Sequence, residues 1–227
     1  MTGPFDPAFE ELPAELPLFP LTGVLLLPGG TLPLNIFEPR YLRMVEHALG
    51  AGRLIGMVQP MAVGRSGLSV PDGTDLYRTG CAGRIVAFEE TGDGRYVLRL
   101  RGVCRFAVGD ELPLLHGFRR AHVDFAPYRA DLSAAGEKLG DRTRLMGLLK
   151  AYFELENIDA DWDTVTQTPD DRLVTTLAMV CPFEAADKQA LLESADLERR
   201  AKLIIALIED ALRRDDDNGG AGSSAVN

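Results

Sequence analysis

Serine, histidine and clustered carboxylates are the side chains of this sequence that could do chemistry, and none has the neighbours that catalysis requires. A serine nucleophile needs an adjacent base, commonly a histidine or a lysine of lowered pKa. Ser66 and Ser69 stand in no G-x-S-x-G motif and have no lysine near them in the sequence. The three histidines, His47, His116 and His122, are isolated residues. Isolated histidines are usually surface or structural groups, so we expect no catalytic residue.

The sequence also lacks the motifs that bind nucleotides and metal ions. A P-loop binds phosphates through G-x-x-x-x-G-K-[ST], yet no Gly-Lys pair occurs. No H-E-x-x-H motif is present to indicate a metal site. Glu89 and Glu90 are adjacent residues that would face opposite sides of a strand, which favours solvated carboxylates. We therefore expect no ATPase, metal or cofactor, while a hydrolase with a site assembled from scattered residues stays open as an alternative.

The charge balance disfavours nucleic acid as a partner. The 227 residues carry a net charge of -10, and the pI is about 4.8. Residues 1 to 128 hold 12 basic and 14 acidic side chains, and residues 129 to 227 hold 12 and 20. Non-specific affinity for nucleic acid comes from Lys and Arg at phosphates, so this partner is not expected. A PUA-like nucleic-acid binder nevertheless remains a second alternative.

Cysteine usage and the absence of targeting signals indicate a cytoplasmic protein. Cys81, Cys104 and Cys181 are odd in number and contain no Cys-x-x-Cys pair, so we expect buried thiols in a reducing compartment. The N-terminus turns acidic at Glu10 and Glu11, where a secretory signal would have a basic start and an apolar stretch. No apolar run approaches the roughly 20 residues that span a bilayer, and no membrane partner is expected.

Residues 14 to 127 are expected to form a β-rich domain with one packed helix, after a flexible arm of residues 1 to 13. In the segment 31–37, Leu32, Leu34 and Ile36 alternate with less apolar residues, which is the period of a strand with one buried face. The helical period of 39–49 then predicts a helix that starts at a proline and stops at a glycine. Other strands are expected at 54–59, 83–89, 95–101, 103–108 and 118–125, and a hairpin turn should join 83–89 to 95–101.

Residues 128 to 214 change to a helical period and are expected to form a helical bundle. One helix centres on 145–155. Another follows Thr168-Pro169, which supplies an N-cap and a first-turn proline, and it should end at Cys181-Pro182. Two more are expected at 184–194 and 196–213. Residues 215 to 227 are rich in Asp, Gly and Ser and predict a disordered tail.

A long loop, residues 60–75, is the candidate binding element. It is rich in glycine and proline but keeps four apolar side chains, those of Met61, Val63, Leu68 and Val70. Loops of this length are commonly functional, and methionine adapts to many peptide surfaces. We therefore predict that these four residues bind polypeptide. The alternative, that they cover one end of the β-rich domain, is equally compatible with the sequence.

Several blocks of this sequence closely resemble the Lon N-terminal domain family. They are Leu16–Gly29, Leu32–Tyr41, Arg53–Val58, Gly80–Ile85, Asp93–Leu98, Gly102–Phe106, Asp187–Glu193 and Leu197–Ala201. The resemblance covers about residues 14 to 212. It implies an α+β fold, a PUA-like pseudo-barrel followed by a helical bundle. It also implies a free-standing version of the unit that helps Lon proteases select unfolded or tagged substrates, without their ATPase and Ser-Lys peptidase modules.

The resemblance carries over no catalytic residue, because this part of the family has none. Within the matching motif we expect Phe37 and Tyr41 to seal the helix against the barrel, and Glu38 and Arg40 to fix the corner between strand and helix. The expected function is a non-catalytic polypeptide-binding or adaptor module. Its expected partners are polypeptide segments, or a proteolytic or chaperone system, and the sequence leaves its oligomeric state open.

Overall fold

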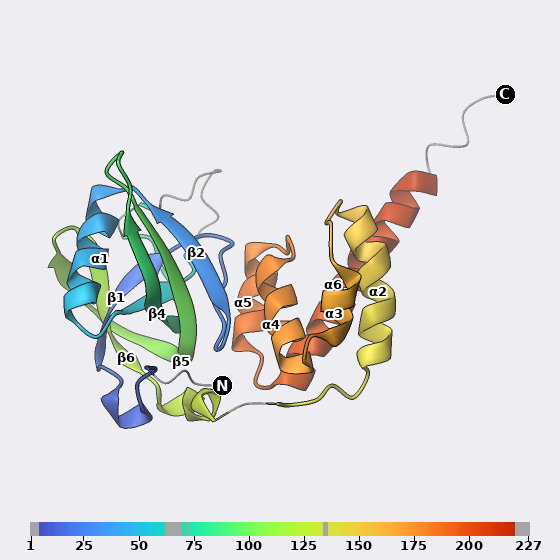
Figure 1. The fold of residues 1–227 in the computed structure, drawn as a ribbon, viewed down its shortest axis with the longest axis horizontal. Coiled ribbons are helices and arrows are strands. Elements are labelled where there is room, and N and C mark those ends of the chain that lie inside the picture. Colours follow the sequence, from blue (N-terminus) through green and yellow to red (C-terminus); the bar gives the residue numbers. More distant parts are fainter. Residues whose placement is uncertain (1–4, 62–69, 72, 134–135, 221–227) are drawn as a thin grey trace. The chain divides into compact units, whose positions relative to one another are not determined.

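The computed structural model of the chain describes residues 5–61, 70–71, 73–133 and 136–220, of which 218–220 are described by their backbone alone (Figure 1). The chain divides into two compact units. The sheet unit comprises Met1–Ala135 and Glu184–Glu193, and the helical unit comprises Gly136–Phe183 and Ser194–Asn227. The chain therefore leaves the sheet unit and returns to it for one short segment.

Six strands form one mixed sheet in the sheet unit. They are β1 (Glu15–Pro20), β2 (Thr31–Ile36), β3 (Leu54–Val58), β4 (Thr79–Glu90), β5 (Tyr96–Leu115) and β6 (Phe118–Asp124). The order is β2-β5-β4-β3-β1-β6, and β5 pairs with β6 as well. Five strands thus close into a ring, while β2 lies outside it on one edge of β5. Short 3-10 turns, η1 (Phe9–Glu11) and η2 (Ala126–Leu132), precede β1 and follow β6.

β5 is a single strand of 20 residues, whereas the sequence predicted separate strands on either side of residue 102. Gly102 permits the continuous strand because another segment crosses it closely. A Cβ at this position would lie 2.0 Å from the carbonyl oxygen of Leu27. The backbone N–H of Gly102 donates to the oxygen of Gly30 at 2.9 Å. The glycine therefore marks a close backbone approach and not a strand end.

The core of the sheet unit is filled by aliphatic side chains around Phe106. Gly56 and Gly80 face this ring, and a Cβ on either would come within 2.8 Å of its Cζ atom. The helix α1 (Pro39–Gly50) packs on β1, β3 and β6 and buries Tyr41, Met44, Val45 and Ala48. That is the face predicted from its sequence period.

The helix α5 (Ala185–Glu193) belongs to the sheet unit, although its sequence period placed it with the other helices. A network of buried polar groups holds it. The Gln59 side-chain amide donates to the carbonyl of Ala185 at 3.0 Å, and that of Gln189 donates to the carbonyl of Thr79 at 3.1 Å. The Lys188 ammonium donates to the carbonyl of Gly23 at 3.0 Å.

The helical unit contains α2 (Arg142–Leu155), α3 (Trp162–Gln167), α4 (Asp170–Val180) and α6 (Leu197–Gly220). Both α2 and α4 pack against α6. The short α3 was not predicted; the Asp161 carboxylate caps it by accepting from the N–H groups of Asp163 and Thr164. α4 begins one residue later than predicted, with Pro169 as its N-cap. α6 continues to Gly220, beyond the predicted end at residue 213. In the described part of the chain, no helix is long and apolar enough to cross a membrane.

Candidate functional site

The motif of residues 36–41 forms the corner where β2 ends and α1 begins. Glu38 is the residue before the helix, and its carboxylate lies 3.0 Å from the Arg40 guanidinium. The same guanidinium donates to the carbonyl oxygen of Val70 at 3.0 Å. Tyr41 is buried against Phe19, with ring centroids 4.4 Å apart. These contacts hold Glu38, Arg40 and Tyr41 at the corner, and Arg40 also binds the backbone at the end of the long loop.

Phe37 does not seal the helix, and this part of the prediction is wrong. Its side chain is 55% exposed. Residue 36 ends the strand with its side chain buried, so Phe37 follows on the outward face of the strand. Its nearest described aromatic or cationic contact is the Arg95 guanidinium, 5.9 Å from the ring centroid. An exposed phenylalanine at a strand end is available to a partner.

The predicted loop site is only partly described. Met61 is 56% exposed, as a binding residue should be, whereas Val70 is 5% exposed and so presents no side chain to a partner. Val63 and Leu68 lie outside the described residues. The base of the loop is closed by the N–H of Met61, which donates to the carbonyl of Asp75 at 2.8 Å. The structure thus leaves Met61 as the one described loop residue that fits the prediction.

β2 offers a free main-chain edge beside Phe37, which sequence reasoning missed. In the described part of the chain, β2 pairs only with β5, in a register that opposes Thr31 to Arg101 and Ile36 to Tyr96. Antiparallel ladders alternate bonded and non-bonded pairs. Because the oxygen of Gly30 accepts from Gly102, residues 32, 34 and 36 bond to β5. The main-chain groups of Thr31, Pro33 and Asn35 consequently point away from the sheet.

Exposed side chains border this edge on the outward face of the sheet. Val97 lies opposite Asn35 and is 43% exposed, and Arg99 lies opposite Pro33. Phe37 follows Asn35 by two residues on the same face, within diagonal reach of Val97. In the described residues Arg99 is exposed and forms no ion pair. One end of the edge is therefore apolar, and a cation lies nearer its middle.

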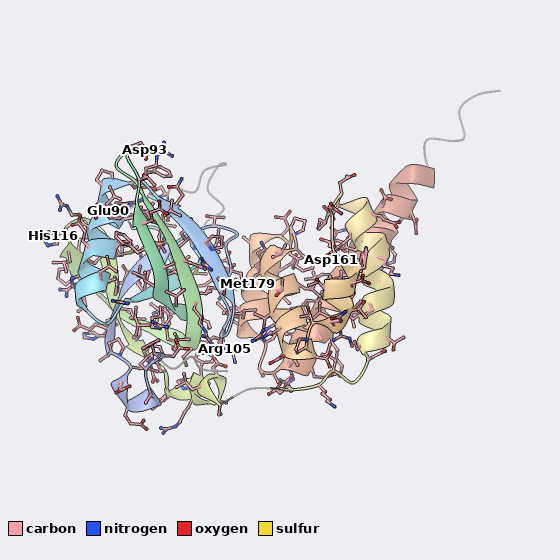
Figure 2. The ribbon with its side chains drawn as sticks, viewed as in Figure 1. Glu90, Asp93, Arg105, His116, Asp161 and Met179 are labelled. Carbon is pink, nitrogen blue, oxygen red and sulfur yellow. The ribbon has the colours of Figure 1, made fainter. Side chains whose placement is uncertain are left out.

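Acidic groups gather at the tip of the β4–β5 hairpin, where Arg95 contacts both Asp93 and Phe37. Figure 2 shows Asp93 at the hairpin tip with Glu90 below it on β4. Asp93 is bound by its neighbour Arg95 at 3.0 Å. A hydrogen bond from Thr91 lowers the pKa of the Asp93 carboxyl. These carboxylates are solvated turn groups, as the sequence predicted for Glu89 and Glu90.

The buried thiols and two of the histidines have structural surroundings, while Ser66 and Ser69 lie outside the described residues. Burial raises the pKa of the Cys104 thiol to about 12 and that of the Cys81 thiol well above its usual range. Thiols of such high pKa are poor nucleophiles. His47 packs on the ring of Phe118, with centroids 5.5 Å apart, and His122 lies 3.8 Å from the Glu15 carboxylate. Across the described ranges, no three His, Cys, Asp or Glu residues gather in a way that could hold a metal ion.

Comparison with known proteins assigns the family. The model of the ATP-dependent protease La (LON) substrate-binding domain matches residues 15–210. The chain belongs to this family. As a Lon-type substrate-binding domain, it is 30% identical over 206 residues to Lon protease 2 of Myxococcus xanthus, an alignment that covers 88% of this chain and 24% of that protein. Lon protease 2 of Sorangium cellulosum is 28% identical, with 89% and 26% covered. The chain therefore spans about a quarter of the length of these relatives.

Solved structures agree with the assignment. The crystal structure of a Lon N-terminal domain protein from Xanthomonas campestris has a TM-score of 0.59 and 27% identity, covering 85% of this chain and 97% of that one. The N-terminal domain of the Mycobacterium avium complex Lon protease has the same TM-score at 18% identity, covering 86% and 98%. The second likeness concerns the fold alone. The Lon N-terminal fold expected from the sequence is thereby confirmed.

Proposed function

We propose that this Lon-type substrate-binding domain is a non-catalytic polypeptide-binding or adaptor module of the cytoplasm. The observation that carries the proposal is the family match over residues 15–210, to a domain described as substrate-binding in a protease family. The substrates of a protease are polypeptides, so the partner is a polypeptide segment, presented alone or by a proteolytic or chaperone system. We also propose that the sheet unit is a PUA-like pseudo-barrel and that the helical unit is a helical bundle.

Exposed apolar side chains of the sheet unit support a surface that grips unfolded chains. Phe37 and Met61 are each more than half exposed, at 55% and 56%. Exposed aromatic and methionine side chains are the types that adapt to varied polypeptide partners. The loop prediction is retained for Met61, and for Val63 and Leu68, which the structure does not describe.

A permanently unfolded polypeptide tests the function directly. Fluorescein-labelled lactalbumin, reduced and carboxymethylated, is titrated with the protein, and binding is followed by fluorescence anisotropy. We expect saturable binding that Phe37→Ser weakens by about tenfold or more, since burial of a large apolar side chain contributes about 1.5–3 kcal/mol. Leu114→Ser is the matched control, because Leu114 is 53% exposed but lies near the β5–β6 turn. Absence of binding by the unaltered protein would contradict the proposal.

The two alternative functions are separated by assays on the same sample. A hydrolase would release peptides from casein, with or without ATP and Mg²⁺, above a mock purification. A nucleic-acid binder would shift the anisotropy of a labelled oligonucleotide at low salt, where phosphate contacts are strongest. The proposed function predicts neither signal. Either signal, abolished by a point substitution in this chain, would replace the proposal.

A further inference from the structure

We propose that the free edge of β2 is the polypeptide site, and that an extended segment of the partner adds to it as a further strand. This inference rests on the proposed function and names where and how the partner binds. Main-chain pairing needs little from the partner sequence, because every residue except proline carries the same donor and acceptor. Such a site therefore suits a domain whose partners are unfolded chains of many sequences.

The edge presents five main-chain groups with the spacing of a strand. Thr31 and Asn35 each direct an N–H and a C=O outward, and Pro33 directs a C=O alone. This follows from the bond between Gly102 and Gly30, which sets the alternation of the ladder. Among the described residues, none of these outward groups has another hydrogen-bond partner. Groups repeating every second residue match the period of an extended chain.

Side chains beside the edge indicate which segments fit best. A partner residue opposite Asn35 would lie on the outward face next to Phe37, which favours an apolar side chain there. The partner residue two positions along would lie opposite Pro33. The long side chain of Arg99, which lies on β5 opposite Pro33, can extend across β2 toward this partner residue. Since Arg99 is exposed and forms no ion pair in the described residues, an acidic side chain fits this position. The preferred segment is extended, with an apolar and an acidic residue two positions apart.

A second copy of this chain fits the edge less well. If two copies paired antiparallel through their β2 edges, Pro33 of one copy would lie opposite Pro33 of the other. Neither proline has a backbone N–H to donate. Proline and cations on an edge are devices that discourage pairing between folded copies. An unfolded partner avoids this conflict because it can align any of its residues with the edge.

The test removes one outward donor without changing the sheet. Asn35→Pro deletes the N–H of residue 35 and places a ring on the edge, while Asn35→Ala changes only the side chain and keeps the N–H. Pro33 already occupies the same phase of β2, so a second proline is compatible with pairing to β5. With labelled, reduced and carboxymethylated lactalbumin as the probe, we expect Asn35→Pro to weaken binding about fivefold or more, and Asn35→Ala to bind like the unaltered protein.

A gain of affinity complements this loss. Pro33→Thr restores the missing donor, so it should tighten binding of the same probe by about twofold or more. Hydrogen exchange of residues 31–36 should slow when the probe is bound. Circular dichroism and a melting curve would reveal whether Asn35→Pro unfolds β2. In that case Pro33→Thr still tests the proposal.

The outcomes separate this inference from the function on which it rests. If the unaltered protein binds the probe and both Asn35→Pro and Pro33→Thr bind equally well, the edge is not the site, while polypeptide binding stands. If the unaltered protein does not bind, both fall. A concentration-dependent dimer that Asn35→Pro abolishes, seen by size-exclusion chromatography, would assign the edge to a second copy and overturn the inference.

Discussion

Arg105 holds both carboxylate oxygens of Asp131: its Nε and Nη2 atoms donate to Oδ2 and Oδ1 at 2.9 and 2.8 Å. Both side chains are buried, with 7% and 9% exposed. The remaining Nη1 atom donates to the carbonyl of Leu192 at 3.0 Å. Arg105 (labelled in Figure 2) thus ties three parts of the sheet unit together, β5, η2 and α5.

Removal of the Asp131 carboxylate should strongly destabilise the sheet unit. Asp131→Ala leaves the Arg105 guanidinium buried without its counter-ion, a change that costs about 3–5 kcal/mol of unfolding free energy. Urea unfolding followed by circular dichroism measures it. Glu10→Ala is the control, because the Glu10–Arg129 pair is exposed, with 70% and 62% of the side chains accessible. A shift for Asp131→Ala no larger than that of the control would show that the pair does not stabilise the fold.

Two glycine-to-alanine substitutions should act in opposite directions. Gly102→Ala sets a Cβ 2.0 Å from the Leu27 carbonyl oxygen, so we expect a loss of about 3 kcal/mol or more, or no folding. Gly147 lies in α2 with nothing within 4 Å of an added Cβ. Gly147→Ala should therefore raise stability by about 0.5–1 kcal/mol through helix propensity. Thermal denaturation compares them, and equal effects of the two variants would refute the crossing at Gly102.

Acid should weaken the helical unit through Asp170. A hydrogen bond from the Leu139 N–H, followed by the ion pair with Arg142, lowers the pKa of the Asp170 carboxyl below its usual 3.8. A lowered pKa in the folded state adds stability above pH 4 that is lost as the pH falls through the folded value. Asp170→Asn should thus cost stability at pH 7 and progressively less below pH 4. Fluorescence of Trp162, the single tryptophan, reports this unit during urea unfolding.

If Asp170→Asn lowers the free energy of unfolding by the same amount at pH 7 and at pH 3, the linkage to the Asp170 carboxyl is ruled out. Asp216→Asn provides the comparison, because Asp216 is an exposed residue of α6. It should unfold like the unaltered protein at both pH 7 and pH 3. The comparison removes the general effect of one charge less in a protein of net charge -10.

The three thiols should not react with thiol reagents while the protein is folded. Cys81, Cys104 and Cys181 are buried and form no disulfide bonds, and burial raises the pKa of the Cys104 thiol to about 12. Since the thiolate is the reactive form, we expect no reaction with a disulfide dye at pH 8 within minutes, and three equivalents after unfolding in guanidinium. Rapid reaction of one thiol in the native protein would disprove its burial.

Much of the fold was predictable because its signals are local. The helical period of residues 39–49 gave the buried face of α1, and the turn at residues 91–94 gave the β4–β5 hairpin. The blocks that resemble the Lon N-terminal domain family are local too, since each is a run of neighbouring residues. Side-chain period and turn residues act over a few positions, so they can be read from the chain alone.

Features that depend on distant segments could not be predicted in this way. Gly102 interrupts an apolar pattern and predicted a strand break, yet the crossing of residue 27 explains it. α5 has the sequence of an ordinary helix, but its polar contacts with residues 23, 59 and 79 place it in the sheet unit. Phe37 was expected to be buried because it is aromatic. Its side chain is exposed because it follows the buried Ile36 and so lies on the opposite face of the strand.

The amino-acid order by itself indicated most of the helices and strands, the lack of a recognised catalytic motif, and the family that the chain resembles, because each of these is carried by neighbouring residues. Tertiary structure alone decided that β2 stays outside the closed ring and, among the described residues, has no second strand beside it near Phe37. Strand order arises from hydrogen bonds between residues far apart in the chain, and the period of one strand does not reveal which of its edges finds a neighbour.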